Sequence, residues 1–241
     1  MALPKLDVAI YELALPSTNK KISYRPFLVR EEKILLMAME GSDEGEITNS
    51  IKQVINNCIV SDGVNVDTLP LFDIEYILLN LRARSMGDVI KTNYTRPDCK
   101  EENCVPIEIE IDVNTIKVHK SPEHNAKIEL SDKVGLVMKY PNIELMTKYA
   151  GKFEDESIDD AFDLIIKCID TVYDEENVYS KTDYTAAELV EFVEGFSQDQ
   201  FSQIEKFFNT LPKMYKDVEF DCKKCNHKEE IRLEGLASFF G

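Results

Sequence analysis

The chain has 241 residues, of which 44% are hydrophobic and 30% are charged, a composition typical of a soluble globular protein with one or two domains. Its 28 Lys and Arg against 45 Asp and Glu give a net charge of −17, which disfavours binding to nucleic acid or to a membrane surface. The first residues show no secretory signal, and the apolar stretch Ile34–Met39 is far too short to span a membrane. We therefore expect a cytosolic protein whose six cysteines are reduced, catalytic or metal-bound.

Residues 1–87 are expected to form an N-terminal hairpin followed by helices. Val8–Leu15 and Ile22–Phe27 are strand candidates on either side of a segment of turn residues. The next apolar segment predicts a helix that ends near residues 41–43. A second helix is indicated by one apolar stripe with a 3.6-residue period, formed by Ile47, Ile51, Val54, Ile55 and Cys58. A third helix, over Leu71–Arg84, is apolar on two sides and is expected to lie between other elements.

The pattern changes to strand alternation after residue 88. Ile107, Ile109 and Ile111 alternate with glutamates, which predicts a strand with one face exposed to water. Shorter strand candidates follow at Ile116–Val118, Ile128–Leu130 and Leu136–Tyr140. Alternation returns in residues 218–241, and we expect residues 88–141 and 215–241 to form one β domain together.

Residues 142–214, which lie between these two segments, are expected to be an inserted acidic helical subdomain. Ile143–Ala150 predicts a short helix, and an apolar stripe over residues 158–172 predicts a long amphipathic one. Two capping boxes, in which Thr185 pairs with Glu188 and Ser197 pairs with Gln200, predict the starts of two more helices. Residues 151–200 carry fifteen acids and three bases. The expected fold class is α+β.

Four of the six cysteines form two close pairs. Cys99 and Cys104 have the spacing C-x4-C, and Cys222 and Cys225 have the spacing C-x2-C. Each pair begins with Asp-Cys-Lys and is followed by alternating aliphatic residues, so each is predicted to lie on a turn between two strands. Two such turns facing each other supply four thiolates, which is the ligand set of a structural zinc site. The sequence therefore predicts zinc-ribbon-like β-hairpins from two distant segments.

The distance between the pairs leaves other interpretations open. The two pairs are separated by 117 residues, against about 15 to 20 in a compact zinc ribbon. A shared site requires the intervening helices to be an insertion, which costs little loop entropy. The alternatives are two reduced pairs on tight turns, or a redox dithiol formed by Cys222 and Cys225. His227 is a further potential ligand. Because the C-x4-C spacing of the first pair is longer than C-x2-C, Cys104 is the least certain of the four predicted ligands.

The positions of the remaining cysteines and the lack of common catalytic motifs argue against an enzyme. Cys58 and Cys168 lie on or beside apolar stripes and are expected in the core. The sequence contains no nucleotide-binding glycine motif, no G-x-S-x-G and no H-E-x-x-H, and it has three histidines. The acidic runs at 154–156 and 174–176 are interpreted as solvated surfaces. The two helices around Gly195 resemble a helix-turn-helix in outline, but their acids would repel phosphate, which favours a helix pair or a partner-binding face.

Two pairs of adjacent phenylalanines are candidates for partner contacts. These are Phe207 with Phe208 and Phe239 with Phe240. Adjacent residues cannot both point into one helical stripe, so one of each pair is expected to be presented outward. Burial of both in a two-sided core is the alternative.

Three segments carry a resemblance to a known family. They are the opening LPKLDVAIYELALPSTNKKISYRPFLVREEKILLMAME, the stretch Leu81–Gly87, and the ending EGLASFFG. These resemble the T-even-type phage baseplate protein family, which covers the baseplate hub subunit and the hub assembly catalyst, and Tyr184–Met214 fits it too. The resemblance covers essentially the whole chain.

The resemblance implies a non-enzymatic role in building the central hub of a contractile tail's baseplate. It implies contacts with other hub or tail assembly proteins, in the cytoplasm of an infected bacterium or in the virion tail. It supplies no catalytic residues, and it adds support to zinc as a structural cofactor. The competing hypothesis is a zinc-ribbon regulator, such as a polymerase-associated adaptor, that uses acidic helices to engage a basic protein.

Overall fold

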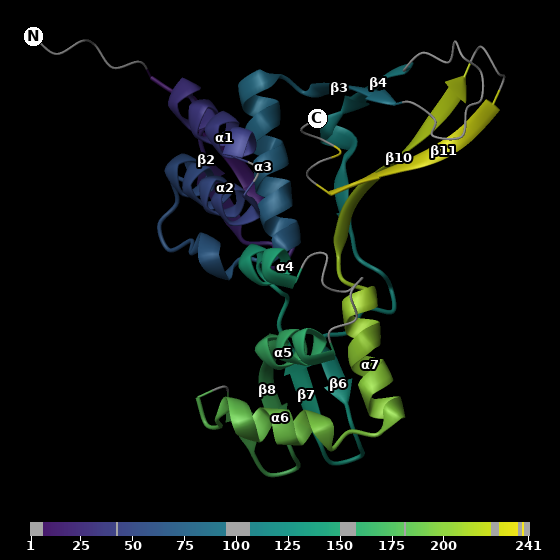
Figure 1. Cartoon of the computed structure of the whole chain (residues 1–241). Coiled ribbons are helices and arrows are strands. Elements are labelled where there is room, and N and C mark those ends of the chain that lie inside the picture. The colour runs from purple at the N-terminus through teal and green to yellow at the C-terminus, as the bar shows by residue number, and fades with distance from the viewer. Residues whose placement is uncertain are drawn as a thin grey trace, which may run out of the picture. The chain divides into compact units, whose positions relative to one another are not determined.

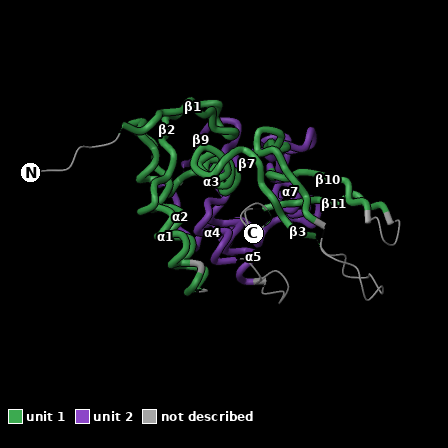
Figure 2. Tube along the Cα trace, turned by 90° about the horizontal axis from the view of Figure 1, so that it is seen from above, with its two compact units in different colours: residues 1–119, 213–241 green, residues 120–212 purple. Residues whose placement is uncertain are grey.

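The computed structural model describes residues 7–41, 43–94, 107–149, 158–180, 182–222, 227–235 and 238. The chain divides into two compact units, which Figure 2 shows in separate colours. Unit 1 comprises residues 1–119 and 213–241, and unit 2 comprises residues 120–212. His119 and Lys213, where the chain leaves unit 1 and returns to it, are register partners in one strand pair. Unit 2 is thus inserted between two residues that are neighbours in a sheet.

Unit 1 combines helices with three small antiparallel sheets (Figure 1). Its helices are α1 (Val29–Gly41), α2 (Glu44–Cys58) and α3 (Leu71–Met86), with short 3-10 turns η1 (Val66–Thr68) and η2 (Val113–Thr115). Its strands are β1 (Tyr11–Ala14), β2 (Lys21–Tyr24), β3 (Val89–Tyr94), β4 (Ile107–Asp112), β5 (Lys117–His119), β10 (Lys213–Cys222) and β11 (His227–Glu234). The sheets have the orders β1-β2, β3-β4 and β11-β10-β5.

The predicted N-terminal hairpin and the first three helices are confirmed. Ile22 and Tyr24, which alternate along the second strand and so share one face, are both buried. Asp43 caps α2 by accepting a hydrogen bond from the N–H of Glu46, at the break expected between the first two helices. Helix α3 is buried on several sides, as its two apolar faces predicted, and it packs against both α2 and β10.

A buried carboxylate ties the hairpin to the start of α1. The Glu31 side chain is fully buried and forms ion pairs with Arg25 at 3.0 Å and with Arg30 at 2.7 Å. It also accepts a hydrogen bond from the N–H of Leu28. Burial raises the pKa of Glu31, but the hydrogen bonds from Arg25, Leu28 and Arg30 outweigh burial and bring the pKa down to about 2.

Unit 2 is built on a four-stranded antiparallel sheet with the order β6-β7-β8-β9. Its strands are β6 (Lys127–Glu129), β7 (Gly135–Met138), β8 (Ile169–Tyr173) and β9 (Val178–Ser180), and its helices are α4 (Ile143–Tyr149), α5 (Ile158–Cys168), α6 (Ala186–Glu194) and α7 (Gln198–Asn209). Gly135 is register partner of Tyr173, and a Cβ at this position would clash with the Tyr173 ring. The glycine therefore permits β7 and β8 to pair closely.

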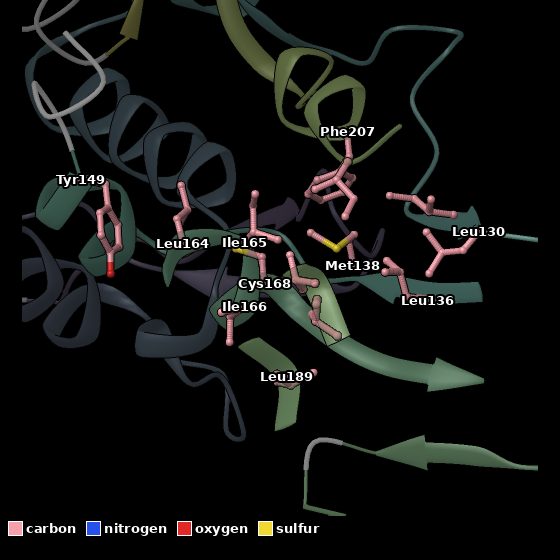
Figure 3. Packing of buried hydrophobic residues seen from close by; sticks show 14 residues of the cluster. Leu130, Leu136, Met138, Tyr149, Leu164, Ile165, Ile166, Cys168, Leu189 and Phe207 are labelled. Carbon is pink, nitrogen blue, oxygen red and sulfur yellow. The ribbon is translucent and has the colours of Figure 1, made fainter. Parts of the chain in front are cut away.

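The apolar core of unit 2 joins the sheet to the helices (Figure 3). Leu136 and Ile169 of the sheet and Ile204 of α7 are completely buried. Both predicted capping boxes are confirmed, with Thr185 and Glu188 at the start of α6 and Ser197 and Gln200 at the start of α7. Two reciprocal caps fix where these helices begin, and therefore which residues face the core.

The helix predicted over residues 158–172 is wrong in its second part. Helix α5 ends at Cys168, and the next residues form strand β8, which pairs with β7 and β9. Ile169 and Val172 fit a helical stripe, but the segment Ile169–Tyr173 is also rich in β-branched and aromatic residues, which suit a strand. Pairing with β7 decides between the two, and neither β8 nor β9 was expected.

The boundaries of the units differ from the predicted domains at residues 88–141 and 142–214. Strands β6 and β7 are expected to belong with the cysteine-bearing hairpins, but β6 pairs with β7 and β7 with β8, and all three lie in unit 2. The observed class is a mixed α+β fold with small antiparallel sheets. Among the helices of the described ranges, none combines the length and apolar character needed to span a membrane.

The ion pairs of Glu31 lead to a test of acid stability. The pKa of Glu31 in the folded chain lies below its unfolded value, so its stabilisation is present above about pH 4 and is lost as the pH falls through about 2. We expect Glu31→Gln to lower the free energy of unfolding of unit 1 by about 3 kcal/mol at pH 7, and by much less near pH 2. Thermal unfolding across this pH range measures the effect. Glu40→Gln, which changes an exposed acid on the same helix, is the control, and equal losses in both variants would contradict the prediction.

Candidate functional site

The two predicted cysteine-bearing turns each lie between paired strands, as expected. Strands β3 and β4 pair from Val89↔Asp112 to Tyr94↔Ile107, and the connection that carries Cys99 and Cys104 lies outside the described residues. Strands β10 and β11 pair from Tyr215↔Glu234 to Cys222↔His227. The backbone of Cys222 is thus placed at the end of β10, while Cys225 lies outside the described residues.

The two hairpins pack against each other near their cysteine-bearing ends. Tyr94 at the end of β3 makes an edge-on ring contact with Phe220 of β10, with ring centroids 4.9 Å apart. Phe220 also belongs to the buried cluster that contains Ile109 and Ile111 of β4. Tyr94 is the last described residue before the first cysteine pair, and Phe220 stands two positions before Cys222. Strands that are distant in the sequence therefore meet where the cysteine segments begin.

The other two cysteines are core residues, as predicted. Cys58 at the end of α2 and Cys168 at the end of α5 are completely buried. Burial raises the pKa of the Cys58 thiol to about 11, so it stays protonated at neutral pH. Neither has the exposed thiolate character of a reactive cysteine.

The phenylalanines proposed as partner contacts fall into two groups. Phe207 has 1% of its surface exposed and lies 5.1 Å from the ring of His124, between centroids. Phe208 is partly buried against the same core, which matches the alternative of a two-sided core. Phe239 and Phe240 lie outside the described residues.

His124 is held inside unit 2 by two hydroxyl groups. Its Nδ1 lies 3.0 Å from Thr210 Oγ1, and its Nε2 lies 3.2 Å from the Tyr140 hydroxyl. Burial lowers the pKa of His124, which favours the neutral imidazole. The neutral ring, with a hydrogen-bond partner at each nitrogen, links Tyr140, which follows β7, to Thr210 at the end of α7.

The acidic runs have structural partners where they are described. Asp174 accepts hydrogen bonds from the N–H groups of Glu176 and Asn177 and so closes the turn between β8 and β9. Glu175 pairs with Lys133 at 3.0 Å. The run at 154–156 lies outside the described residues.

A half-buried carboxyl group in unit 1 is not predicted by the sequence pattern. Glu75 of α3 lies beside the pair formed by Lys213 and Glu234, whose charged atoms are 2.9 Å apart. Burial, reinforced by the negative charge of Glu234, raises the pKa of Glu75 to about 7, and Lys213 offsets only part of this. Glu75 is not recognisable from sequence because its neighbours come from the C-terminal strands.

Two adjoining hollows on unit 2 form a groove lined by apolar and acidic residues, which the sequence pattern does not predict. One has a volume of about 370 Å³ and is lined by Phe162, Val193, Phe196 and Phe201 together with Glu194, Ser197, Gln198 and Glu205. The other, of about 260 Å³, is lined by Phe162, Ile166, Val190, Asp159, Asp163 and Glu194. Because they share Phe162 and Glu194, the hollows are parts of one groove.

In the part of the chain that the structure describes, no three His, Cys, Asp or Glu side chains form a group able to hold a metal ion. The predicted zinc ligands are not among these residues, because Cys99, Cys104 and Cys225 lie outside the described ranges and the Cys222 side chain is not described.

Comparison with known proteins identifies the class of protein. Residues 8–241 match the family described as T4 bacteriophage base plate protein, and the chain belongs to this family. The resemblance seen in the sequence is thereby confirmed. Among curated proteins, the chain is 22% identical over 230 residues to the baseplate hub assembly protein gp26 of Enterobacteria phage T4, covering 95% of this chain and 97% of the relative. No solved structure matches.

The raised pKa of Glu75 leads to a stability test of opposite sign to that of Glu31. Because the pKa of Glu75 is higher in the folded chain than in the unfolded one, stability is present below about pH 4 and is lost as the pH rises towards 7. We expect Glu75→Gln to raise the free energy of unfolding of unit 1 by about 1 to 3 kcal/mol at pH 8, with little change at pH 4. Chemical denaturation at the two pH values measures this. Glu219→Gln on the exposed face of β10 should have no effect at either pH, and a loss of stability in Glu75→Gln at pH 8 would refute the expectation.

Proposed function

We propose that this protein takes part in assembling the central hub of a contractile-tail baseplate, as a non-enzymatic component that acts through protein–protein contacts. The observation that carries the proposal is the match to a baseplate hub assembly protein over nearly the full length of both chains. Membership of the baseplate family gives independent support. A relationship that spans both units suggests that the two chains share an architecture and a role.

The partners we propose are other hub or tail assembly proteins of the same phage. The site of action is the host cytoplasm during assembly, and the tail baseplate where the protein remains with the particle. A family of baseplate proteins fits both places. Neither nucleic acid nor membrane is a proposed partner, because a net charge of −17 repels phosphate groups.

Exposed apolar side chains on unit 1 support a role in contacts. Helix α1 presents Val29, Leu36 and Met37 to solvent, with 80%, 57% and 61% of their surfaces exposed. Leu36 follows Val29 by seven positions, so these two residues lie on one face of the helix, and Met37 extends the exposed apolar surface beside Leu36. An apolar helix face of this kind is typical of a surface that a partner covers.

Assembly tests the proposed function directly. We expect the full chain, co-expressed with the hub proteins of its phage, to co-elute with a hub subcomplex in size-exclusion chromatography. If contacts involve the acidic segment 151–200, binding should weaken from low to high salt, because exposed charges are screened beyond about 10 Å at 0.1 M. Failure to join any hub subcomplex, together with tight binding to a polymerase, would favour the regulator hypothesis instead.

We also propose that Cys99, Cys104, Cys222 and Cys225 bind one structural zinc ion. The support is that the first pair falls in the sequence between the paired strands β3 and β4, that Cys222 ends β10, and that the two hairpins pack together through Tyr94 and Phe220. Four thiolates would close the coordination shell and tie the first and last segments of unit 1 together. Metal binding would then add to the folding free energy of the hairpins.

Metal analysis tests the zinc proposal. We expect purified protein to contain about one zinc per chain, and Cys222→Ser to lower both the metal content and the thermal stability, because a tetrahedral site loses one ligand. Cys58→Ser is the matched control, since Cys58 is a buried thiol outside the pairs and its loss should leave the metal content unchanged. Unchanged stability of metal-free protein after chelation would overturn the proposal.

A further inference from the structure

The groove of unit 2 has the features of a docking site for a protein helix. Its floor is formed by three half-buried phenylalanines, Phe162 of α5, Phe201 of α7 and Phe196 between α6 and α7. Phe162 and Phe201 stack with ring centroids 5.5 Å apart, and Phe196 makes an edge-on contact with Phe192 at 4.9 Å. The stacked and edge-on contacts hold the rings in place, so the groove is formed before any partner binds.

The rim of the groove is acidic. Asp159, Glu194 and Glu205 are exposed and line it, and none of them forms an ion pair with another residue in the described parts of the chain. Asp163 also lines it but is neutralised by Lys167 at 2.7 Å and Lys148 at 3.2 Å. The lining contains no Lys or Arg. Such a surface, apolar at its base with unpaired carboxylates around it, is complementary to a partner segment that carries an apolar side chain flanked by basic residues.

The groove walls also indicate the secondary structure of the partner. All the lining residues belong to α5, α6, α7 or the Gly195–Ser197 joint, so the groove offers no free strand edge to an extended peptide. Recognition therefore depends on side chains, and an amphipathic helix laid between helices meets this requirement. Unit 2 has 20 Asp and Glu against nine Lys and no Arg, a net charge of −11, so a second copy of this chain would be repelled.

We propose that this groove binds a basic amphipathic helix of a partner protein, with an aromatic or aliphatic anchor seated on Phe162, Phe196 and Phe201 and with Lys or Arg side chains facing Asp159, Glu194 and Glu205. The proposal rests on the assembly function proposed above and names the chemistry of one contact surface for it. The groove provides both parts of the recognition, since apolar burial supplies affinity and the rim charges select for a basic partner.

A designed peptide tests the groove without knowledge of the partner. The probe is a fluorescein-labelled, amidated amphipathic helix with Leu and one Phe on one face and Lys on the other, titrated with the full chain in 50 mM NaCl. We expect saturable binding by fluorescence anisotropy. Replacing the single Phe and its neighbouring Leu by Ala should abolish binding, and so should replacing every Lys by Glu.

Matched charge variants distinguish binding in the groove from non-specific electrostatic attraction of a basic peptide to an acidic protein. We expect Glu194→Gln with Glu205→Gln to weaken binding by about three- to tenfold, since two exposed charge contacts are lost. Glu129→Gln with Glu219→Gln removes the same charge from exposed positions outside the groove and should change affinity less than about twofold. Equal weakening in both double variants would overturn the proposal, as would binding that survives the Ala replacement in the peptide.

Two further outcomes distinguish this inference from the assembly function. If the wild-type chain joins a hub subcomplex and the Glu194→Gln, Glu205→Gln variant joins it equally well in low salt, the groove assignment fails while the assembly function stands. If the wild-type chain joins no hub subcomplex, the assembly function fails whatever the peptide result. Concentration-dependent self-association that the double variant loses, measured by sedimentation, would assign the groove to a second copy and overturn the proposed partner.

Discussion

The pairing of β5 with β10 is the constraint on which the rest of this fold depends. It makes His119 and Lys213 neighbours, so residues 120–212 leave and re-enter unit 1 at one point of a sheet. The same strand β10 supplies Met214 and Phe220 to the core that covers β3 and β4. Without β10, the cluster around Ile90, Ile109 and Ile111 would lose part of its cover, and the two cysteine-bearing hairpins would have no common core. The C-terminal segment thus completes a structure that begins near the N-terminus.

Two glutamates of unit 1 show how neighbouring groups decide the protonation state of a carboxyl group. Glu31 has two arginines and a backbone N–H directed at it, and these more than offset the cost of burial. Glu75 is half-buried beside the carboxylate of Glu234, and Lys213, which would offset the negative charge, is paired with Glu234. At neutral pH the Glu31 carboxyl group is therefore ionised, whereas the Glu75 carboxyl group is divided between its protonated and ionised forms. Unit 1 is stabilised by the first and carries the second at a cost that rises with pH.

Much of the fold follows from hydrophobic period and capping, because these are local properties of the sequence. The N-terminal hairpin, the helices through α3 and the starts of α6 and α7 were all predicted from residues within one element. The predictions that fail are those that depend on contacts between residues distant in the sequence. Ile169 and Val172 fit both periods, and only pairing with β7 makes them a strand. The same pairing moves β6 and β7 into unit 2. The cysteine pairs were visible as motifs, whereas Glu75 and the phenylalanine groove require knowledge of which distant residues lie beside them.

The insertion also sets an order of events during synthesis. All the residues of unit 2 have been made by Pro212, so its sheet and helices can form while the last strands of unit 1 are still within the ribosome. Unit 1 begins earlier but closes later, because β10 and β11 are its final elements. The apolar residues of β3 and β4 stay uncovered by Met214 and Phe220 throughout that interval. A nascent chain that ends before β10 would therefore carry a folded, acidic unit 2 and an incompletely folded unit 1. The exposed apolar residues of β3 and β4 would make such a chain a substrate for chaperones.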